Sequence, residues 1–382
     1  MTQRTTSGKK RTWEVFAPGR INLIGEHIDY QGGWVLPGAI SLGQWIKATE
    51  IDGPSIQVKS PLGTWTYSSS AQLCASNPKD MPSTFFKGVW SSFQKRHPLS
   101  SVGLEIEISG NLPLGAGLSA SASLSAGLGQ ILQLVHHSPL SEEDLIQIAY
   151  ETEREYVGTQ CGYMDPYAVV KSKKNHLLLL NNSDLSIQHI PCDLGPYQLV
   201  LFHTKVAHEL SNSPYNKRRA SVERAWNLLK QLKPKDSVVE ALPYLPMEVL
   251  EQHRGKLSET DYPLARFTLD EQLRVENAVK AINAKEHSTL GALLSQSHQG
   301  LSELYQVSCP ELDFMAEWSQ RQMGVLGARM MGGGFGGCTL NLIHKDHLAD
   351  WTLEALETYR QAYGITGAVY RVDLSDGIYP GR

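Results

Sequence analysis

The sequence of 382 residues has little of what marks secreted, membrane or nucleic-acid-binding proteins. Its five cysteines lie far apart and form no CxxC pair, which argues against a disulfide framework or a zinc site and favours a reducing cytoplasm. No run approaches the roughly 18 apolar residues that span a membrane, and the polar residues 1–11 lead into no apolar signal segment. The balance of 35 basic and 39 acidic residues gives a charge of −4, so nucleic acid and anionic lipid are not expected partners.

The composition is that of a globular protein, with 41% hydrophobic and 19% charged residues. The chain is too long for one ordinary core and suits two domains of moderate size. Because neither a repeat nor a low-complexity linker divides it, the boundary has to be placed by pattern. Residues 192–196 suit a crossing between domains, so we predict an N-terminal domain over 1–195 and a C-terminal domain over 196–382.

A strand, a glycine-rich loop and a helix follow one another in the first half. Apolar and other residues alternate over 102–108, which predicts a strand that ends at Gly110, and apolar residues recur at helical spacing after Ser119. Between them, residues 113–123 combine glycines, free helix-start N–H groups and hydroxyls, which suits a phosphate. A glycine turn that caps a tightly packed helix is the alternative. No lysine lies between Gly110 and Gln130, which excludes a Walker A loop.

The remaining elements are predicted from periodicity and end signals. A helix should begin after Ser141, whose hydroxyl can cap it and whose acidic successors suit the helix dipole, and should end near Gly158. Further helices are expected over 218–232 and 270–284, and strands over 177–180, 340–343 and 368–374.

Four polar residues stand among glycines and apolar residues in the segment 17–40: Arg20, Glu26, His27 and Asp29. Polar groups embedded in this way need partners, and fixed carboxylates with an imidazole are suited to recognise a polyol. An internal ion pair that steadies a loop, from Arg20 to Glu26 or Asp29, is the alternative.

Two acidic residues and a second glycine run complete the candidates. Glu153 lies near the buried face of its helix and could bind Mg²⁺, although a rim ion pair with Arg154 or a lysine is the more ordinary role. Asp165 stands in an apolar run and could act as a general base, although capping a helix start before Pro166 is the commoner use. The glycines of 330–338 indicate either close approach to a ligand or a tight turn before the next strand.

Taken together and in this order, the motifs resemble the GHMP kinase superfamily and in detail its galactokinases. The resemblance runs from about residue 14 to 380 and rests on the segments 20–30, 161–165, 214–219, 307–313 and 327–338. It implies an α+β, two-domain GHMP kinase fold, in which the N-terminal domain is of the ribosomal-protein-S5-domain-2 type and the C-terminal domain is ferredoxin-like. It places the active site in the cleft between them, and it implies a cytoplasmic enzyme that uses ATP and Mg²⁺.

The resemblance also implies the roles of individual residues. Asp165 takes the position of the catalytic base, with Arg20 as the catalytic cation beside the attacking oxygen. Sugar recognition falls to Glu26, His27, Asp29, Gly162 and Tyr215. Magnesium binding falls to Ser121 and Glu153. ATP binding falls to Pro113, Gly115, Ala116, Gly117, Leu118, Ser119, Ala120, Ser121, Gly333 and Gly334.

Three positions depart from the usual galactokinase pattern and bear on which sugar is used: Pro166, Pro214 and Phe267. The expected reaction is ATP-dependent phosphorylation of galactose at its 1-hydroxyl. Phosphorylation of N-acetylgalactosamine or another monosaccharide is one alternative. A kinase-shaped sugar sensor that signals through a partner protein is another, against which the retained Asp165, Arg20 and Glu153 argue.

Overall fold

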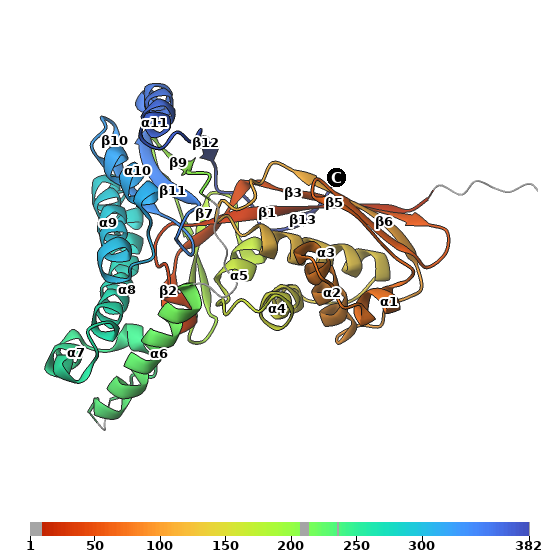
Figure 1. Cartoon of the computed structure of the whole chain (residues 1–382), viewed down its shortest axis with the longest axis horizontal. Helices are drawn as coiled ribbons and strands as arrows, with labels where there is room; N and C mark the ends of the chain where they lie inside the picture. Colours follow the sequence, from red (N-terminus) through yellow and green to blue (C-terminus); the bar gives the residue numbers. More distant parts are fainter. Residues whose placement is uncertain (1–9, 207–213, 235–236, 382) are drawn as a thin grey trace, which may run out of the picture.

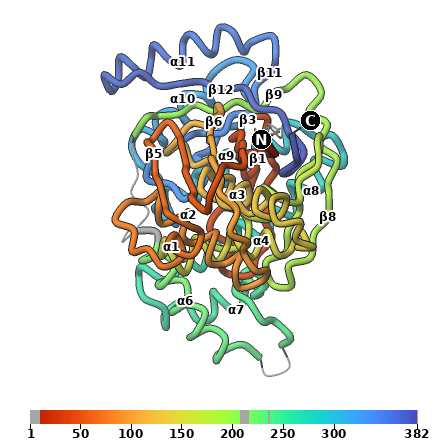
Figure 2. Tube along the Cα trace, turned by 90° about the vertical axis from the view of Figure 1, so that its right-hand side faces the viewer, coloured from red at the N-terminus to blue at the C-terminus, as the bar shows by residue number. Residues whose placement is uncertain are grey.

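The computed structural model describes residues 10–206, 214–234 and 237–381, and it leaves out the side chains of Pro214 and Tyr215. Two parts lie side by side (Figure 1). The right-hand part of that view holds a six-stranded sheet above five helices, and the left-hand part holds a four-stranded sheet beside α8 to α11. Seen at right angles, α11 lies at one end of the molecule and α6 and α7 lie at the other (Figure 2).

The six-stranded sheet has the strand order β13-β1-β3-β6-β4-β5. All its neighbours are antiparallel except the parallel pair β4 and β6. Leu104, Ile106 and Ile108 of β6 are buried, which confirms the strand predicted from their alternation. The strands are β1 (Thr12–Asn22), β3 (Pro37–Ile51), β4 (Ile56–Ser60), β5 (Gly63–Tyr67), β6 (Gly103–Gly110) and β13 (Tyr379–Pro380).

Five helices cover the lower face of this sheet in Figure 1. They are α1 (Ser70–Ala75), α2 (Met81–Gln94), α3 (Ala120–His136), α4 (Glu142–Glu151) and α5 (Met164–Lys171). Helix α3 buries Leu128, Ile131 and Val135, as its periodicity predicts. It packs closely on the sheet, because a Cβ added at Gly127 would lie 2.4 Å from Cδ1 of Ile46 in β3.

Helix α4 has the predicted start and a changed end. Ser141 and Asp144 form a reciprocal capping box, which satisfies two backbone N–H groups at the helix start. After Glu151 the helix widens into one π-helical turn, η2 (Thr152–Val157), which ends at Gly158 with φ 90°. The π turn carries Glu153 and therefore re-aims its side chain relative to a regular helix.

The second part of the chain builds the four-stranded sheet β10-β11-β9-β12, in which all pairs are antiparallel. Its strands are β9 (Tyr197–His203), β10 (Val325–Met330), β11 (Cys338–His344) and β12 (Ala368–Val372). The last is shorter than predicted, because Leu374 leaves the strand and forms an isolated bridge with Ile40. Around the sheet lie α9 (His287–Gln299), α10 (Pro310–Gln320) and α11 (Leu348–Tyr363).

A third sheet and three more helices complete the arrangement. The sheet is β2 (Trp34–Val35), β7 (His176–Asn181) and β8 (Ile187–Pro191). The helices are α6 (Pro214–Leu232), α7 (Met247–Gln252) and α8 (Asp261–Asn283). Helix α6 contains the predicted helix 218–232 and begins earlier. Helix α8 also begins earlier than the predicted helix 270–284, but it ends at Asn283, with Ala284 as its C-cap. Short 3₁₀ or π turns are η1 (Asp29–Gln31), η3 (Leu242–Tyr244), η4 (Arg254–Lys256), η5 (Gly300–Leu304) and η6 (Lys345–His347).

The predicted domain boundary lies just before β9, the first strand of the second sheet. The chain later returns, because β13 pairs with β1 at the edge of the first sheet. One hydrophobic cluster also includes residues from both parts, such as Ile24 and Leu340. The boundary at residue 195 therefore stays a prediction. None of the helices described is long and apolar enough to cross a membrane.

Two glycines let α9 lie directly on β10. A Cβ added at Gly327 would lie 2.0 Å from the carbonyl oxygen of Gly291, so the backbones themselves are in contact. We expect Gly327→Ala to lower the free energy of unfolding by about 1–3 kcal/mol, because the backbones must move apart. Gly255→Ala is the control, since nothing lies within 4 Å of its added Cβ. Denaturant unfolding measures both, and equal stability of the two variants would contradict the packing argument.

Candidate active site

The glycine loop between β6 and α3 opens the backbone toward a cavity. Gly115 and Gly117 have φ values of 70° and 73°, in the left-handed region that glycine adopts without strain. Helix α3 then begins at Ala120, and its first N–H groups lack partners within the helix. A helix N-terminus of this kind attracts anions through its N–H groups and its dipole.

Arg20 reaches this loop from β1. A register shift between Pro18 and Arg20 interrupts the pairing of β1 with β3, and such irregularities re-aim side chains. Nε and Nη2 of Arg20 donate to the two oxygens of Asp165 at 2.8 and 3.1 Å, and Nη1 donates to the carbonyl oxygen of Gly117 at 2.6 Å. Only 4% of Arg20 is exposed, so this bidentate pair is shielded from water on the arginine side.

Asp165 lies in the first turn of α5, where it accepts hydrogen bonds from two other segments. Besides Arg20, the hydroxyl of Ser119 donates to its Oδ2. Ser119 is the N-cap residue of α3, but with φ 57° it is left-handed and its side chain does not cap the helix. The hydroxyl is thereby directed toward Asp165.

Two of the other carboxyl groups that line the cavity with Asp165 have raised pKa values. Burial raises the pKa of Asp29 to about 7, and the negative charge of Asp165 adds to the effect. Burial likewise raises the pKa of Glu153 to about 7, again with a contribution from Asp165, while hydrogen bonds from Ser121 and Thr159 oppose the shift. Asp29 also accepts a hydrogen bond from the N–H of Gly162 at 3.1 Å. The site thus concentrates acidic groups around one cavity.

The second glycine run lies against the first. A Cβ added at Gly332 would lie 3.2 Å from the carbonyl oxygen of Gly117, and one at Gly337 would lie 3.3 Å from that of Ala116. The bare backbone of this run therefore allows two loops to touch. The N–H of Gly332 donates to Oε1 of Glu26 at 2.8 Å, which connects the run to the segment that carries Arg20.

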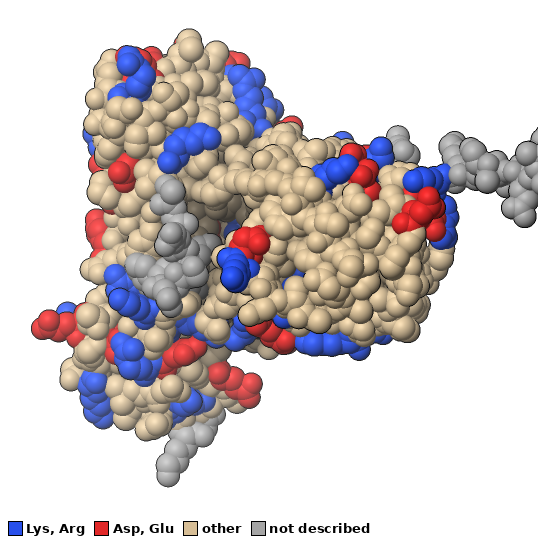
Figure 3. All heavy atoms as spheres, turned by 45° about the vertical axis from the view of Figure 1, so that its right-hand side comes forward, with Lys and Arg blue, Asp and Glu red and all other residues tan. Residues whose placement is uncertain are grey.

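Together these elements enclose a cavity of about 270 Å³. A second cavity of about 310 Å³ adjoins it, lined mainly by apolar side chains, and Ala120 and Ser121 belong to both walls. The face of the molecule in Figure 3 shows acidic and basic side chains interspersed, without a broad patch of one sign.

Three family models match the sequence. A GHMP kinase N-terminal domain matches residues 84–173, a GHMP kinase C-terminal domain matches 278–360, and a galactokinase galactose-binding signature matches 4–49. The galactokinase of Staphylococcus carnosus is 35% identical over 367 residues, which is 95% of this chain and 93% of that protein. The galactokinase of Thermotoga maritima is 35% identical over 366 residues, 96% of this chain and 99% of that protein.

The chain belongs to the galactokinase family of GHMP kinases.

Solved structures agree with this placement. The galactokinase of Lactococcus lactis, crystallised with galactose, matches 98% of this chain and 96% of its own with a TM-score of 0.91 and 29% identity. The mevalonate kinase of Methanococcus jannaschii has a TM-score of 0.70 over 97% of this chain at 16% identity, which shows the fold alone. The α+β GHMP kinase fold expected from the sequence is thereby confirmed.

The structure brings most of the predicted galactokinase site residues together around the first cavity. The lining contains Arg20, Glu26, His27, Asp29, Pro113, Gly115, Ala116, Gly117, Leu118, Ser119, Ala120, Ser121, Glu153, Gly162, Asp165 and Gly333. Gly334 is different, because its added Cβ would lie 2.0 Å from the carbonyl oxygen of Val307 and the residue lines neither cavity. The side chain of Tyr215 lies outside the described residues.

The departures from the galactokinase pattern are placed in different surroundings. Pro166 lines the first cavity beside Asp165. Phe267 is fully buried in α8, with its ring centroid 4.8 Å from that of Tyr305. The side chain of Pro214 is not among those described.

The structural alternatives considered for Arg20 and Asp165, a local ion pair and a helix cap, were wrong. Arg20 pairs with Asp165 and not with Glu26 or Asp29. Asp165 does not cap its helix, whose N-cap residue is Tyr163.

Glu153 also lacks the partner that its neighbourhood suggested. In the described part of the chain no arginine or lysine forms an ion pair with it. Nη2 of the neighbouring Arg154 instead donates to Gln160 at 3.0 Å.

Sequence reasoning missed two groups at this site. Arg329 is fully buried and its Nη2 donates to Glu26 at 2.6 Å. The sequence indicated that Arg329 has a partner, because an arginine inside an apolar strand cannot be buried without one. Gly332 was passed over in favour of its neighbours, although its N–H shares the same carboxylate oxygen.

Asp29 gives a testable dependence of stability on pH. Its carboxyl group has a pKa of about 7 in the folded protein against 3.8 as a model value, so between these pH values the folded state holds a proton that the unfolded state releases. The contribution of Asp29 to the free energy of unfolding must then fall as pH rises, by up to about 1.4 kcal/mol per pH unit. We expect the unfolding free energy of wild type minus that of Asp29→Asn to decrease from pH 4 to about 7.

Denaturant unfolding at several pH values measures this difference. Asp184→Asn is the control, because hydrogen bonds from Ser186 lower the pKa of this exposed carboxyl group. Its difference from wild type should not decrease over the same range. A wild-type advantage over Asp29→Asn that stays constant or grows with pH would show that Asp29 is ionised in the folded protein.

Proposed function

We propose that this chain is an ATP-dependent galactokinase that transfers the γ-phosphoryl group of ATP to the 1-hydroxyl of galactose. The observation that carries the proposal is the carboxylate of Asp165, held by Arg20 and Ser119 in the cavity at the N-terminus of α3. An oriented carboxylate next to an anion-binding backbone is what transfer to a hydroxyl needs. The galactokinases of similar sequence, one of them solved with galactose, supply the substrate expectation.

The nucleotide is expected on the α3 side of the site. The loop from Gly115 to Ser119 and the first N–H groups of α3 suit the phosphates, because they offer unpaired donors and the positive end of a helix dipole. The adjoining apolar cavity suits the base, since purine rings are bound mainly by apolar contact. Ala120 and Ser121 line both cavities and would lie between base and phosphates.

The sugar is expected on the opposite side, against the segment from Glu26 to Asp29 and Gly162. These groups combine buried carboxyl oxygens with an imidazole, and buried polar groups discriminate strongly between ligands that pair with them and ligands that do not. Pro166 lines the same cavity and is the position at which sugar preference is expected to differ from that of relatives with another residue there.

In the proposed reaction Asp165 accepts the proton of the attacking hydroxyl. The sugar oxygen forms a bond to the γ-phosphorus while the bond from that phosphorus to the β,γ-bridging oxygen breaks, and ADP leaves with that oxygen. Arg20 binds both oxygens of Asp165, so it fixes the base and places a positive charge where negative charge develops. Positioning and charge neutralisation supply most of what phosphoryl transfer requires.

The residues present also fit a magnesium ion held by Ser121 and Glu153. Glu153 is a half-buried carboxyl group whose pKa is raised by desolvation and which accepts a hydrogen bond from Ser121, so a divalent cation would relieve an unfavourable ionisation. No three His, Cys, Asp or Glu side chains in the described chain converge as a metal site, which suits Mg²⁺ because phosphates and water commonly complete its shell. When bound, the ion would neutralise charge on the triphosphate.

The first test is turnover by the wild-type protein and by Asp165→Asn. Wild type with Mg-ATP should release ADP with galactose, and a panel including N-acetylgalactosamine and glucose defines its selectivity. Asp165→Asn should lower kcat by about 10²- to 10⁴-fold, because it cannot accept the proton, while calorimetric ATP binding persists. Asp184→Asn, an exposed turn residue, is the control. If none of the sugars in the panel leads to ADP release, the proposed function is refuted. A near-normal kcat in Asp165→Asn would refute the role of Asp165 as the catalytic base.

The metal assignment has a separate test. We expect Glu153→Gln to raise the Mg²⁺ concentration for half-maximal activity about tenfold or more. Since only the ionised carboxylate binds the metal, the apparent Mg²⁺ affinity of wild type should rise with pH up to about 7, and Glu153→Gln should lose that dependence. Glu155→Gln, an exposed neighbour paired with Lys95, should behave as wild type. An unchanged Mg²⁺ requirement in Glu153→Gln would exclude Glu153 as a ligand.

A further inference from the structure

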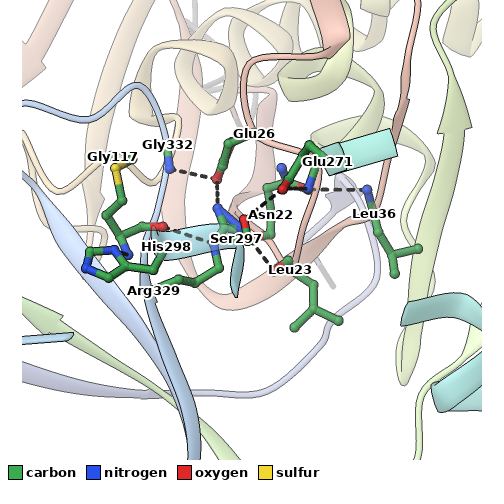
Figure 4. Close-up of polar contacts among 12 residues, drawn as sticks. Asn22, Leu23, Glu26, Leu36, Gly117, Glu271, Ser297, His298, Arg329 and Gly332 are labelled. Carbon is green, nitrogen blue, oxygen red and sulfur yellow. Dashed lines mark hydrogen bonds and ion pairs between the residues drawn. The ribbon is translucent and has the colours of Figure 1, made fainter. Parts of the chain in front are cut away.

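Arg329 is a fully buried arginine near the end of β10, and each of its guanidinium nitrogens has an acceptor (Figure 4). Nε donates to the carbonyl oxygen of Met330 at 3.0 Å, and Nη1 donates to that of Leu23 at 2.9 Å, with Asn22 at 3.4 Å. Nη2 donates to Oε1 of Glu26 at 2.6 Å. One side chain from the second part of the chain therefore holds the backbone and the carboxylate of the segment 22–26.

One of the two carboxylate oxygens of Glu26, Oε1, already accepts hydrogen bonds. Oε1 accepts from Arg329 and from the N–H of Gly332, at 2.6 and 2.8 Å. Among the described residues none donates a hydrogen bond to Oε2, although Glu26 lines the first cavity and is only 1% exposed. With Oε1 fixed, Oε2 is the oxygen available to a ligand, and its direction depends on how Arg329 holds the carboxylate.

The same contacts reach the nucleotide side of the cavity. β10 ends at Met330, and the run that follows contains Gly332, whose backbone lies against Gly117 of the phosphate loop. Figure 4 shows Glu26 between Gly332 and Arg329, so the carboxylate connects the sugar-side segment to this run. A movement of the glycine run that follows β10 would therefore also move Oε1 of Glu26.

The surroundings of Arg329 leave its charge facing Glu26. Behind it, Nδ1 of His298 accepts the N–H of Met330 at 3.2 Å, and Nε2 lies 3.5 Å from Asp313. Burial lowers the pKa of His298, the charge of Arg329 lowers it further, and Asp313 opposes both. Because the accepting Nδ1 must be unprotonated, the imidazole is neutral, and the guanidinium carries the positive charge next to Glu26.

We propose that Arg329 is a positioning residue for sugar recognition, which orients Glu26 so that Oε2 meets a sugar hydroxyl. The inference rests on the proposed sugar kinase function and adds to it a residue that touches neither sugar nor phosphate. An arginine that only stabilised the fold would change unfolding without changing sugar affinity selectively. If Arg329 acts through Glu26, replacing Arg329 should no longer change sugar affinity once Glu26 has lost its carboxylate.

The test is a double-mutant cycle of Arg329→Gln, Glu26→Gln and the double variant. We expect Arg329→Gln to raise the KM for galactose on the order of tenfold, with a smaller change in the KM for ATP. In the Glu26→Gln background the same substitution should change the KM for galactose little, because the carboxylate it orients is gone. Calorimetric galactose binding gives the same cycle without turnover.

Further variants separate positioning from folding. The double variant removes both members of the buried pair, so it should fold even if Arg329→Gln alone, which leaves a buried carboxylate, does not. Arg329→Lys keeps the charge but not the planar fork that serves Leu23 and Glu26 at once, and should also raise the KM for galactose. Arg96→Gln is the matched control, because it breaks the partly buried pair with Glu151 away from both cavities. It should lower Tm without changing the KM for galactose.

The outcomes are distinguishable. Effects of Arg329→Gln that are equal in the wild-type and Glu26→Gln backgrounds would overturn the inference while leaving the proposed function intact. So would a lowered Tm with an unchanged KM for galactose. A wild-type protein that neither phosphorylates nor binds any monosaccharide would overturn the proposed function and the inference with it.

Discussion

The guanidinium of Arg20 joins the three segments on which the cavity is built. It binds both oxygens of Asp165 and the carbonyl oxygen of Gly117, while its own backbone N–H donates to Leu118 at 3.1 Å. The strand β1, the glycine loop before α3 and the first turn of α5 are thereby fixed relative to one another. Because Arg20 is almost fully buried, loss of its carboxylate partner would leave an uncompensated charge, at a cost of about 3–5 kcal/mol. The pair that we propose for the chemistry is therefore also part of what keeps the site in shape.

The carboxyl groups around the cavity differ in how their charge is balanced. Asp165 and Glu26 each have a buried arginine, whereas Asp29 and Glu153 have raised pKa values because burial and the charge of Asp165 oppose their ionisation. A site with this excess of acid would repel a bare triphosphate. The N–H groups of the loop and of the start of α3 oppose that repulsion, and the Mg²⁺ ion proposed for Ser121 and Glu153 would reduce it further.

The sequence predicted features that neighbouring residues determine better than contacts between distant residues. The strand 102–108 and the capping box of Ser141 were predictable, because neighbouring residues determine both. The partners of Arg20 were not, since 145 positions separate it from Asp165 and reasoning from the residues considered only nearby acids. The pair of Arg329 with Glu26 spans 303 positions and needed the fold. Family resemblance gathered the site residues and placed Arg20 near Asp165, but the π turn under Glu153 had no recognisable signal.

The pairing of β13 with β1 has a consequence for how the protein is made. β1 enters the first sheet near the start of the chain, but the partner on its outer side comes from Tyr379 and Pro380. During synthesis this edge of β1 therefore lacks its folded-state partner until residues 379 and 380 have left the ribosome. An open strand edge is a template for pairing with other chains, so β13 can protect this edge of β1 only after the whole segment between the two strands has been made.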